Sequence, residues 1–309
     1  MTRVLVTGAT GFVGRPLVAH LAATGYGVRA VVRRSPSPPL TASVEVTQGD
    51  LGEPIAWEPQ LRAVDAVVHL AGIAHASRGI AQARYDQINH QATAALARAA
   101  ARAGVKHFVF VSSVRAQSGP AADHVLTERD APRPSDPYGR SKLAAEAAVA
   151  ASGVPFTILR PVLIYGPSLK GNLATLARLA SWPLPLPFGA FANRRSLLGI
   201  DNLVSAIMFV LQNPATRGEI FLVADRTPIS LAEIVTAFCH GVGRRPHLFS
   251  MPPRPMETIV RLAGGAALWE RIGGELVVDP AKLMAAGWSP ATDTKAALMK
   301  SVQASSRPA

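Results

Sequence analysis

The sequence has a single cysteine and no long apolar run. Cys239 stands alone among 309 residues, which excludes an internal disulfide framework and a cysteine-rich zinc site. We therefore expect no metal centre and a reducing, cytoplasmic compartment. No run of about 18 apolar residues occurs, so stable membrane insertion is not expected. Residues 3–6 (RVLV) resemble a strand, and we expect no signal peptide.

Acidic residues are also scarce. The chain has 20 Asp and Glu against 32 Lys and Arg, a formal charge of +12, which favours anionic partners. Nucleic acid is not expected, because no recognition motif or basic stripe interleaved with aromatics occurs. Residues 256–272 mix apolar and arginine side chains and are compatible with a membrane surface, although a helix packed on the core is favoured. The hydrophobic share of 49% excludes a disordered chain.

In the first half of the chain, short apolar runs alternate with helix-like segments. The runs are continuous, which is typical of strands covered on both faces. Strands that alternate with helices predict an α/β fold with a Rossmann-type, doubly wound parallel sheet. The predicted strands are residues 4–7, 28–32, 44–47, 66–70, 108–111, 156–159 and 219–224, and the predicted helices are 16–24, 92–103 and 143–150.

The pattern changes after residue 165, which predicts a smaller second lobe. The segment WPLPLP at 182–187 excludes a regular helix or a central strand. We expect residues 1–165 to form an NAD(P)-binding Rossmann domain, to which residues 196–225 return. Residues 166–195 and 226–309 are expected to form a C-terminal substrate-binding lobe.

A glycine-rich segment, TGATGFVG at 7–14, lies between the first strand and the first helix. Gly8 allows a tight turn, Gly11 lets the backbone approach a pyrophosphate, and Gly14 lets helix and strand pack closely. The diphosphate would lie at the helix N-terminus, where free N–H groups favour negative charge. The strand–turn–helix context makes a dinucleotide cofactor a better interpretation than a plain turn. The cofactor-binding residues predicted here are Gly8, Thr10, Gly11, Phe12, Val13 and Gly14.

The second strand lacks the acidic residue that would accept hydrogen bonds from the adenosine ribose. Arg33 and Arg34 follow it instead. An arginine there can pair with a 2′-phosphate, so NADP is modestly favoured over NAD, unless both are solvated loop charges. Asp50, after the third strand, is predicted either to accept a hydrogen bond from the adenine amino group or to cap its own loop.

Tyr138 and Lys142 form the most specific pair in the sequence. They lie four residues apart in a helix that Asp136 and Pro137 are expected to start, so they share one face. A nearby ammonium lowers the pKa of a tyrosine, which would make Tyr138 a usable acid and base. Ser113 ends a strand at the carboxyl edge of the predicted sheet, where its hydroxyl could hydrogen-bond a reacting oxygen.

Taken together, these motifs resemble the extended short-chain dehydrogenase/reductase family of nucleotide-sugar epimerases, dehydratases and 4-ketoreductases. The similarity is greatest to bacterial 4-reductases and 4-epimerases of lipopolysaccharide sugar synthesis. The matching segments are TGATGFVG at 7–14, GDL at 49–51, HLAG at 69–72, SS at 112–113, YGRSK at 138–142 and LRPVLIYGP at 159–167. The resemblance implies that Ser113, Tyr138 and Lys142 are catalytic, that Lys142 also binds the nicotinamide ribose, and that the protein is a homodimer. The further cofactor residues that it implies are Leu51, Leu70, Ala71, Gly72, Asn89, Ser112 and Tyr138.

The resemblance also implies how a UDP-sugar or other nucleotide-sugar substrate is held. The segment Lys170, Asn172 and Leu173 is similar to the family segment whose asparagine and following N–H bind the nucleotide diphosphate. Arg194 is similar to the arginine that clamps this group, and Arg271 is a second clamp or a surface charge.

Two departures from the family pattern favour one activity over others. Val114 and Arg115 follow Ser113 where dehydratases have Asp-Glu, which argues against a dehydratase. Leu163 replaces an asparagine that many epimerases carry, which argues against a 4-epimerase. The first hypothesis is therefore reduction of a UDP-4-keto-6-deoxy-hexosamine at C4. The alternatives are a UDP-sugar 4-epimerase and a non-catalytic dinucleotide-binding scaffold or regulator.

Overall fold

The computed structural model describes most of the chain. The described residues are 1–34, 40–41, 43–73, 79–167, 169, 171–252, 257–258, 262 and 273–305. Among them, no helix is both long and apolar enough to cross a membrane.

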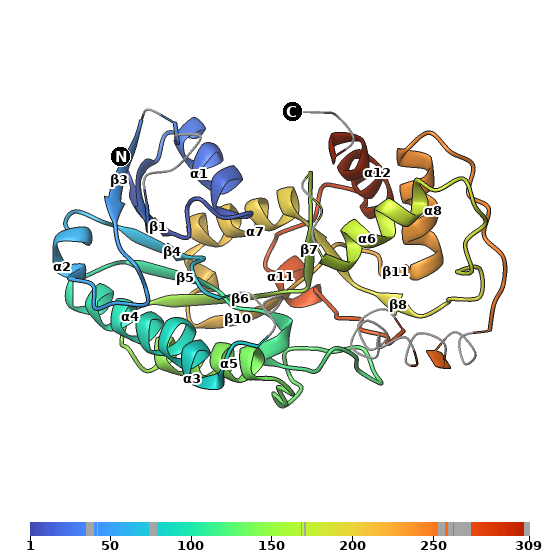
Figure 1. Cartoon of the computed structure of the whole chain (residues 1–309). Helices are drawn as coiled ribbons and strands as arrows, with labels where there is room; N and C mark the ends of the chain where they lie inside the picture. The colour runs from blue at the N-terminus through green and yellow to red at the C-terminus, as the bar shows by residue number, and fades with distance from the viewer. Residues whose placement is uncertain are drawn as a thin grey trace.

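The centre of the molecule is a seven-stranded sheet in the order β10-β6-β5-β4-β1-β2-β3 (Figure 1). Every neighbouring pair in this sheet is parallel, which confirms the predicted doubly wound Rossmann-type sheet. The strands are β1 (Arg3–Thr7), β2 (Gly27–Val32), β3 (Val44–Gln48), β4 (Ala66–His69), β5 (His107–Val111), β6 (Phe156–Pro161) and β10 (Glu219–Val223).

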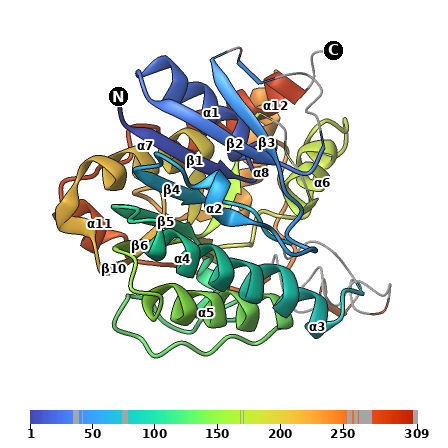
Figure 2. The same ribbon diagram turned by 90° about the vertical axis from the view of Figure 1, so that its left-hand side faces the viewer.

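Helices cover both faces of the sheet, as Figures 1 and 2 show from two sides. One core packs α1 (Gly14–Ala23) and α7 (Ile200–Gln212) on the sheet. The other packs α4 (Ala92–Arg102) and α5 (Pro137–Ala150) on the opposite face. Successive strand residues point to opposite faces, so Val4 joins the first core and Leu5 the second. This explains why the strands are continuous apolar runs.

A third apolar core lies beyond the carboxyl edge of the sheet. It is built from α6 (Gly171–Ala180), α8 (Leu231–Gly241) and α12 (Thr294–Ser305), with Tyr165 at its border. Residues 182–187 cross this region without a helix or a central strand, as their prolines predict. Two small sheets that the sequence did not indicate pair β7 (Leu163–Tyr165) with β9 (Leu197–Gly199), and β8 (Arg194–Arg195) with β11 (Ile229–Ser230).

The remaining elements are short. They are α2 (Trp57–Gln60), α3 (Gln82–Tyr85), a π-helix (Asp86–Gln91), two 3₁₀ turns (Val114–Ala116 and Pro214–Thr216) and α11 (Ala281–Ala285). The π-helix continues directly into α4, and one of the 3₁₀ turns follows β5, so both lie beside the carboxyl edge of the sheet.

Candidate functional site

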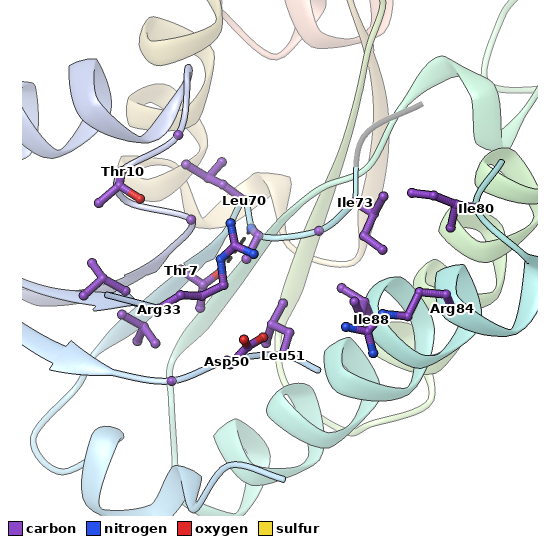
Figure 3. A pocket seen from close by; sticks show the side chains of 17 residues that line it. Thr7, Thr10, Arg33, Asp50, Leu51, Leu70, Ile73, Ile80, Arg84 and Ile88 are labelled. Carbon is purple, nitrogen blue, oxygen red and sulfur yellow. Dashed lines mark hydrogen bonds between the residues drawn. The ribbon is translucent and has the colours of Figure 1, made fainter. Parts of the chain in front are cut away.

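A cavity of about 550 Å³ opens at the carboxyl ends of β1, β2, β3 and β4 (Figure 3). This is the edge at which open parallel sheets bind ligands, and the volume suits a small-molecule or cofactor site. The lining residues that the sequence predicted are Gly8, Thr10, Gly11, Arg33, Asp50, Leu51, Leu70, Ala71 and Gly72. The lining residues that it missed are Thr7, Val31, Val32, Gly49, Ile73, Ile80, Arg84 and Ile88.

The glycine-rich loop is shaped by close backbone approaches. Gly8 has a positive φ of 69°, and a Cβ atom there would lie 2.9 Å from the backbone nitrogen of Ala71. A Cβ atom on Gly14 would lie 2.1 Å from the carbonyl oxygen of Gly8, so only glycine lets α1 start this close to β1. Gly14, Phe12 and Val13 are not among the residues that line the cavity. The loop and the cavity together fit the diphosphate and adenosine parts of a dinucleotide.

The two arginines after β2 differ in position. Both are exposed, but Arg33 lines the cavity, and Figure 3 shows its side chain directed toward Thr7 and Leu70, whereas Arg34 does not line it. Asp50 lines the cavity and also caps its own loop, because its Oδ1 accepts a hydrogen bond of 2.9 Å from the backbone N–H of Gly52. Both interpretations of Asp50 are therefore compatible with the geometry.

Arg84 brings a second guanidinium to the cavity, at the end opposite Arg33 (Figure 3). Its Nη1 donates a hydrogen bond of 2.8 Å to Oε1 of Gln87. Ile80, Arg84 and Ile88 recur at a spacing of four in the sequence, where Ile80 precedes α3, Arg84 lies in α3 and Ile88 lies in the π-helix. This spacing is the signal that could have identified Arg84 from the sequence.

Asn89 connects the cavity to helix α5. It is 1% exposed and belongs to the π-helix, an element common at functional sites. Its Oδ1 accepts a hydrogen bond of 2.7 Å from the N–H of Ile73, and its Nδ2 donates to Ile73 O at 3.1 Å. Nδ2 also donates to Ser141 Oγ at 3.1 Å, and Ser141 Oγ donates to Tyr138 O at 2.8 Å. Asn89 thus supports the site through buried contacts.

Helix α5 begins as the sequence predicts and carries Tyr138 in its first turn. Asp136 is the N-cap, and its Oδ1 accepts a hydrogen bond of 2.6 Å from the N–H of Gly139. A hydrogen bond joins the Ser113 and Tyr138 side chains. The Tyr85 ring meets the Tyr138 ring edge-on, with centres 6.1 Å apart. The structure therefore brings Ser113 and Tyr138 together.

Lys142 lies on the same face of α5, one turn after Tyr138. Its Nζ donates a hydrogen bond of 3.1 Å to the carbonyl oxygen of Val111 and lies 4.7 Å from the centre of the Phe110 ring. A Cβ atom on Gly72, which lines the cavity, would be 3.8 Å from this Nζ. The candidate acid–base group and the dinucleotide cavity are therefore adjoining parts of one site.

Burial dominates the electrostatics of this pair. It raises the pKa of Tyr138 to about 12, although the hydrogen bond from Ser113 and the charge of Arg115 act to lower it. Burial also lowers the pKa of Lys142 to about 8, opposed by the Glu146 carboxylate. The expectation that Lys142 lowers the pKa of Tyr138 toward neutrality is thus wrong for the protein alone. The physical reason is that removal from water disfavours the phenolate, while the ammonium is directed at Val111.

Two of the residues predicted to bind the substrate lie at the start of α6. Asn172 is partly buried there, and the Leu173 side chain belongs to the third core. Arg194 is exposed, whereas Arg195 beside it donates hydrogen bonds to Gly274 O and Pro120 O. Lys170, Arg271 and most of residues 256–272 lie outside the described residues.

The chain is similar to known proteins in sequence and in fold. Residues 4–224 match the model of the NAD dependent epimerase/dehydratase family. The chain is 32% identical to a UDP-glucose 4-epimerase of Vibrio cholerae, over 97% of this chain and 94% of that protein. It is 30% identical to a ceramide reductase of Caulobacter vibrioides, over 81% and 73%. The fold is similar to that of MoeE5 in complex with UDP-glucuronic acid and NAD, with a TM-score of 0.78, 27% identity and 98% of both chains covered.

Proposed function

The chain belongs to the NAD dependent epimerase/dehydratase family, and we propose that it is an NAD-dependent UDP-sugar 4-epimerase. The observation that carries the proposal is the similarity to a UDP-glucose 4-epimerase over 97% of the chain. The joined cavity and Ser113–Tyr138–Lys142 cluster support it, because they supply a cofactor cleft and an acid–base group at its end.

The proposed roles follow from the contacts. Tyr138 takes the proton of the sugar C4 hydroxyl and later returns it, and Ser113 holds the same oxygen through its hydroxyl. The glycine-rich loop and the residues that line the cavity would hold NAD, whose chemistry would be to exchange a hydride with C4, from one face of the sugar ring and then to the other. Lys142 supplies positive charge next to this point and reaches toward Gly72, where the nicotinamide end of the cavity begins. No net oxidation remains after one turnover.

We propose NAD as the cofactor. MoeE5 is known in complex with NAD, which does not support the preference for NADP that Arg33 and Arg34 favoured. In this proposal Arg33 and Arg84 flank the adenosine half at opposite ends of the cavity, and Asp50 and Leu51 lie between them. Mass spectrometry of ligand released from the purified protein tests this, since NAD and NADP differ by the mass of one phosphate.

For the substrate side, the proposal keeps the two-lobe division predicted from the sequence. Residues 1–165 and 196–225 would hold the cofactor, and residues 166–195 and 226–309 the sugar nucleotide. Asn172, the backbone N–H of Leu173 and the exposed Arg194 would bind the diphosphate, because free N–H groups of a first helical turn and a guanidinium both suit phosphate. Lys170, Arg271 and the homodimer remain predictions.

A 4-ketoreductase is the second candidate, and one observation favours it. Leu163, in the position where many epimerases carry asparagine, is 50% exposed on β7. It therefore offers a substrate no side-chain hydrogen bond. The comparisons favour the epimerase, which reverses the order that the sequence alone suggested.

The deciding experiment separates the two activities by their use of cofactor. An epimerase incubated with NAD and UDP-glucose, UDP-N-acetylglucosamine or UDP-glucuronic acid converts one of them to its C4 epimer without accumulating NADH. A 4-ketoreductase instead consumes reduced cofactor stoichiometrically with a UDP-4-keto-6-deoxy-hexosamine. Conversion of none of the three UDP-sugars, together with such consumption, would overturn the epimerase proposal.

A further inference from the structure

Helix α5 buries another charged side chain on the face that carries Tyr138 and Lys142. Glu146 follows Lys142 at the same spacing of four and is 3% exposed. Its Oε1 accepts from Arg160 Nε at 3.0 Å, and its Oε2 accepts from Arg160 Nη2 at 2.6 Å. The Ser112 hydroxyl donates a further hydrogen bond of 2.5 Å to Oε1. The carboxylate is therefore held on both oxygens.

The ion pair joins three parts of the fold that meet at the candidate site. Glu146 belongs to α5, Arg160 to β6, and Ser112 precedes Ser113 at the end of β5. The free edge of the guanidinium continues the network, because Arg160 Nη1 donates to Gln117 Oε1 at 2.9 Å. A displacement of the carboxylate would thus shift both the helix that carries Tyr138 and the segment that carries Ser113.

These groups are closed off from any substrate. Arg160 is 3% exposed, Ser112 4% and Gln117 1%. A network this deeply buried acts on the reaction only through the residues that it holds or whose charge it influences. In a medium of low dielectric constant, such an influence is stronger than it would be at the surface.

Lys142 is the charged group that faces this network. Within the described residues, the groups around its ammonium are the Val111 carbonyl and the Phe110 ring on β5, His69 on β4 and Glu146 on its own helix. Burial lowers the pKa of His69 to about 3, so its imidazole is neutral at ordinary pH. Glu146 is then the anion that opposes the cost of burying the ammonium.

We propose that Glu146, fixed by Arg160 and Ser112, is a positioning residue that keeps the Lys142 ammonium charged and holds the Ser112–Ser113 segment against α5. The inference rests on the proposed function in one respect, the assignment of Lys142 to the catalytic set. Glu146 touches neither substrate nor cofactor, and its effect on the rate depends on pH.

Substitution Glu146→Gln tests the proposal through the pH profile of kcat. With the carboxylate gone, Lys142 loses its proton at lower pH. The alkaline limb of the profile, where kcat falls, therefore shifts to lower pH by about one unit or more. Thr157→Val is the matched control, because it removes a buried hydroxyl of β6 that donates to Thr216 O and lies outside this network, and its limb stays in place. Glu146→Asp keeps the negative charge and restores the limb toward its original position.

Removing one partner of a buried ion pair can prevent folding. The double substitution Glu146→Gln with Arg160→Gln removes both charges of the ion pair, so neither partner is left alone. Lys142 still loses the facing carboxylate. The same downward movement of the limb is expected, with thermal melting showing that the protein is folded. A folded single or double variant whose rate falls equally at every pH would overturn the proposal, since that is the signature of a merely structural pair.

A second readout keeps this test separate from the choice of substrate. The affinity for NADH, followed by fluorescence between about pH 6 and 10, needs no sugar. We expect its alkaline limb to move with the Glu146→Gln substitution in the same direction as that of kcat. If no UDP-sugar is converted but this limb moves, the proposed function fails and the role of Glu146 stands. If UDP-sugars are converted and neither limb moves, the proposed function stands and the role of Glu146 is overturned.

Discussion

The Lys142 ammonium donates a 3.1 Å hydrogen bond to the carbonyl oxygen of Val111, immediately before the Ser112–Ser113 pair. Lys142 thereby links α5 to the strand end that carries Ser113. Since burial lowers its pKa to about 8, the charged form is lost as the pH rises through that value. We expect kcat to fall above about pH 8. A Lys142→Arg variant, whose guanidinium stays charged, should be slower but should lose this decline. A limb that is unchanged in the arginine variant would contradict the assignment.

Tyr138→Phe removes the proposed acid and base while keeping the ring that packs on Tyr85. We expect kcat to fall by about 10² to 10⁴, the range for loss of a general acid or base. The amount of bound NAD should not change, because Tyr138 does not line the cavity. Tyr26→Phe is the control, since that hydroxyl accepts a hydrogen bond from Gln212 far from the site. Equal turnover in the two variants would remove Tyr138 from the chemistry.

Gly14→Ala should abolish retention of NAD. The new Cβ atom would lie 2.1 Å from the carbonyl oxygen of Gly8, so the loop must move away from the position that binds a diphosphate. Gly27→Ala is a matched control, because its Cβ atom would meet nothing closer than 3.8 Å. The ratio of bound NAD to protein after purification measures the effect. Retention of NAD by the Gly14 variant would show that the loop does not hold the cofactor.

Asn89→Ala should destabilise the protein as well as slow it. The substitution leaves the partly buried N–H and carbonyl groups of Ile73 without their side-chain partner and removes a buried hydrogen bond to Ser141, at a cost of about 1–3 kcal/mol. Urea denaturation measures the loss, and Gln91→Ala, on the exposed side of the same π-helix, should be nearly neutral. Equal stability of the two variants would mean that Asn89 does not hold the loop after β4.

Much of the fold follows from local patterns in the sequence. Each continuous apolar run became a strand of the central sheet, because a strand buried on both faces has no polar positions. The turn at Gly8 and the helix start at Asp136 were predictable because each depends on a few adjacent residues. Tyr138 and Lys142 share a face for the same reason, since helical spacing is local.

What the sequence did not reveal depends on partners that are distant along the chain. Glu146 meets Arg160 only because β6 pairs with β5, and no spacing rule gives that contact. The short strands β7 and β9 are stable only as a pair. Arg84 reaches the cavity from a helix of four residues. The pKa of Tyr138 was misjudged because burial, which spacing does not show, outweighs a neighbouring charge.

In the proposed reaction, a hydride leaves C4 of a UDP-sugar and returns to it within one site. Incubation of the enzyme and NAD with UDP-glucose carrying deuterium at C4, or with the UDP-sugar that it is found to convert labelled in the same way, tests this directly by nuclear magnetic resonance. We expect the C4 epimer with deuterium retained at C4 and no accumulation of NADH. Loss of the label to solvent, or no epimer while a 4-keto sugar consumes NADH stoichiometrically, would contradict it.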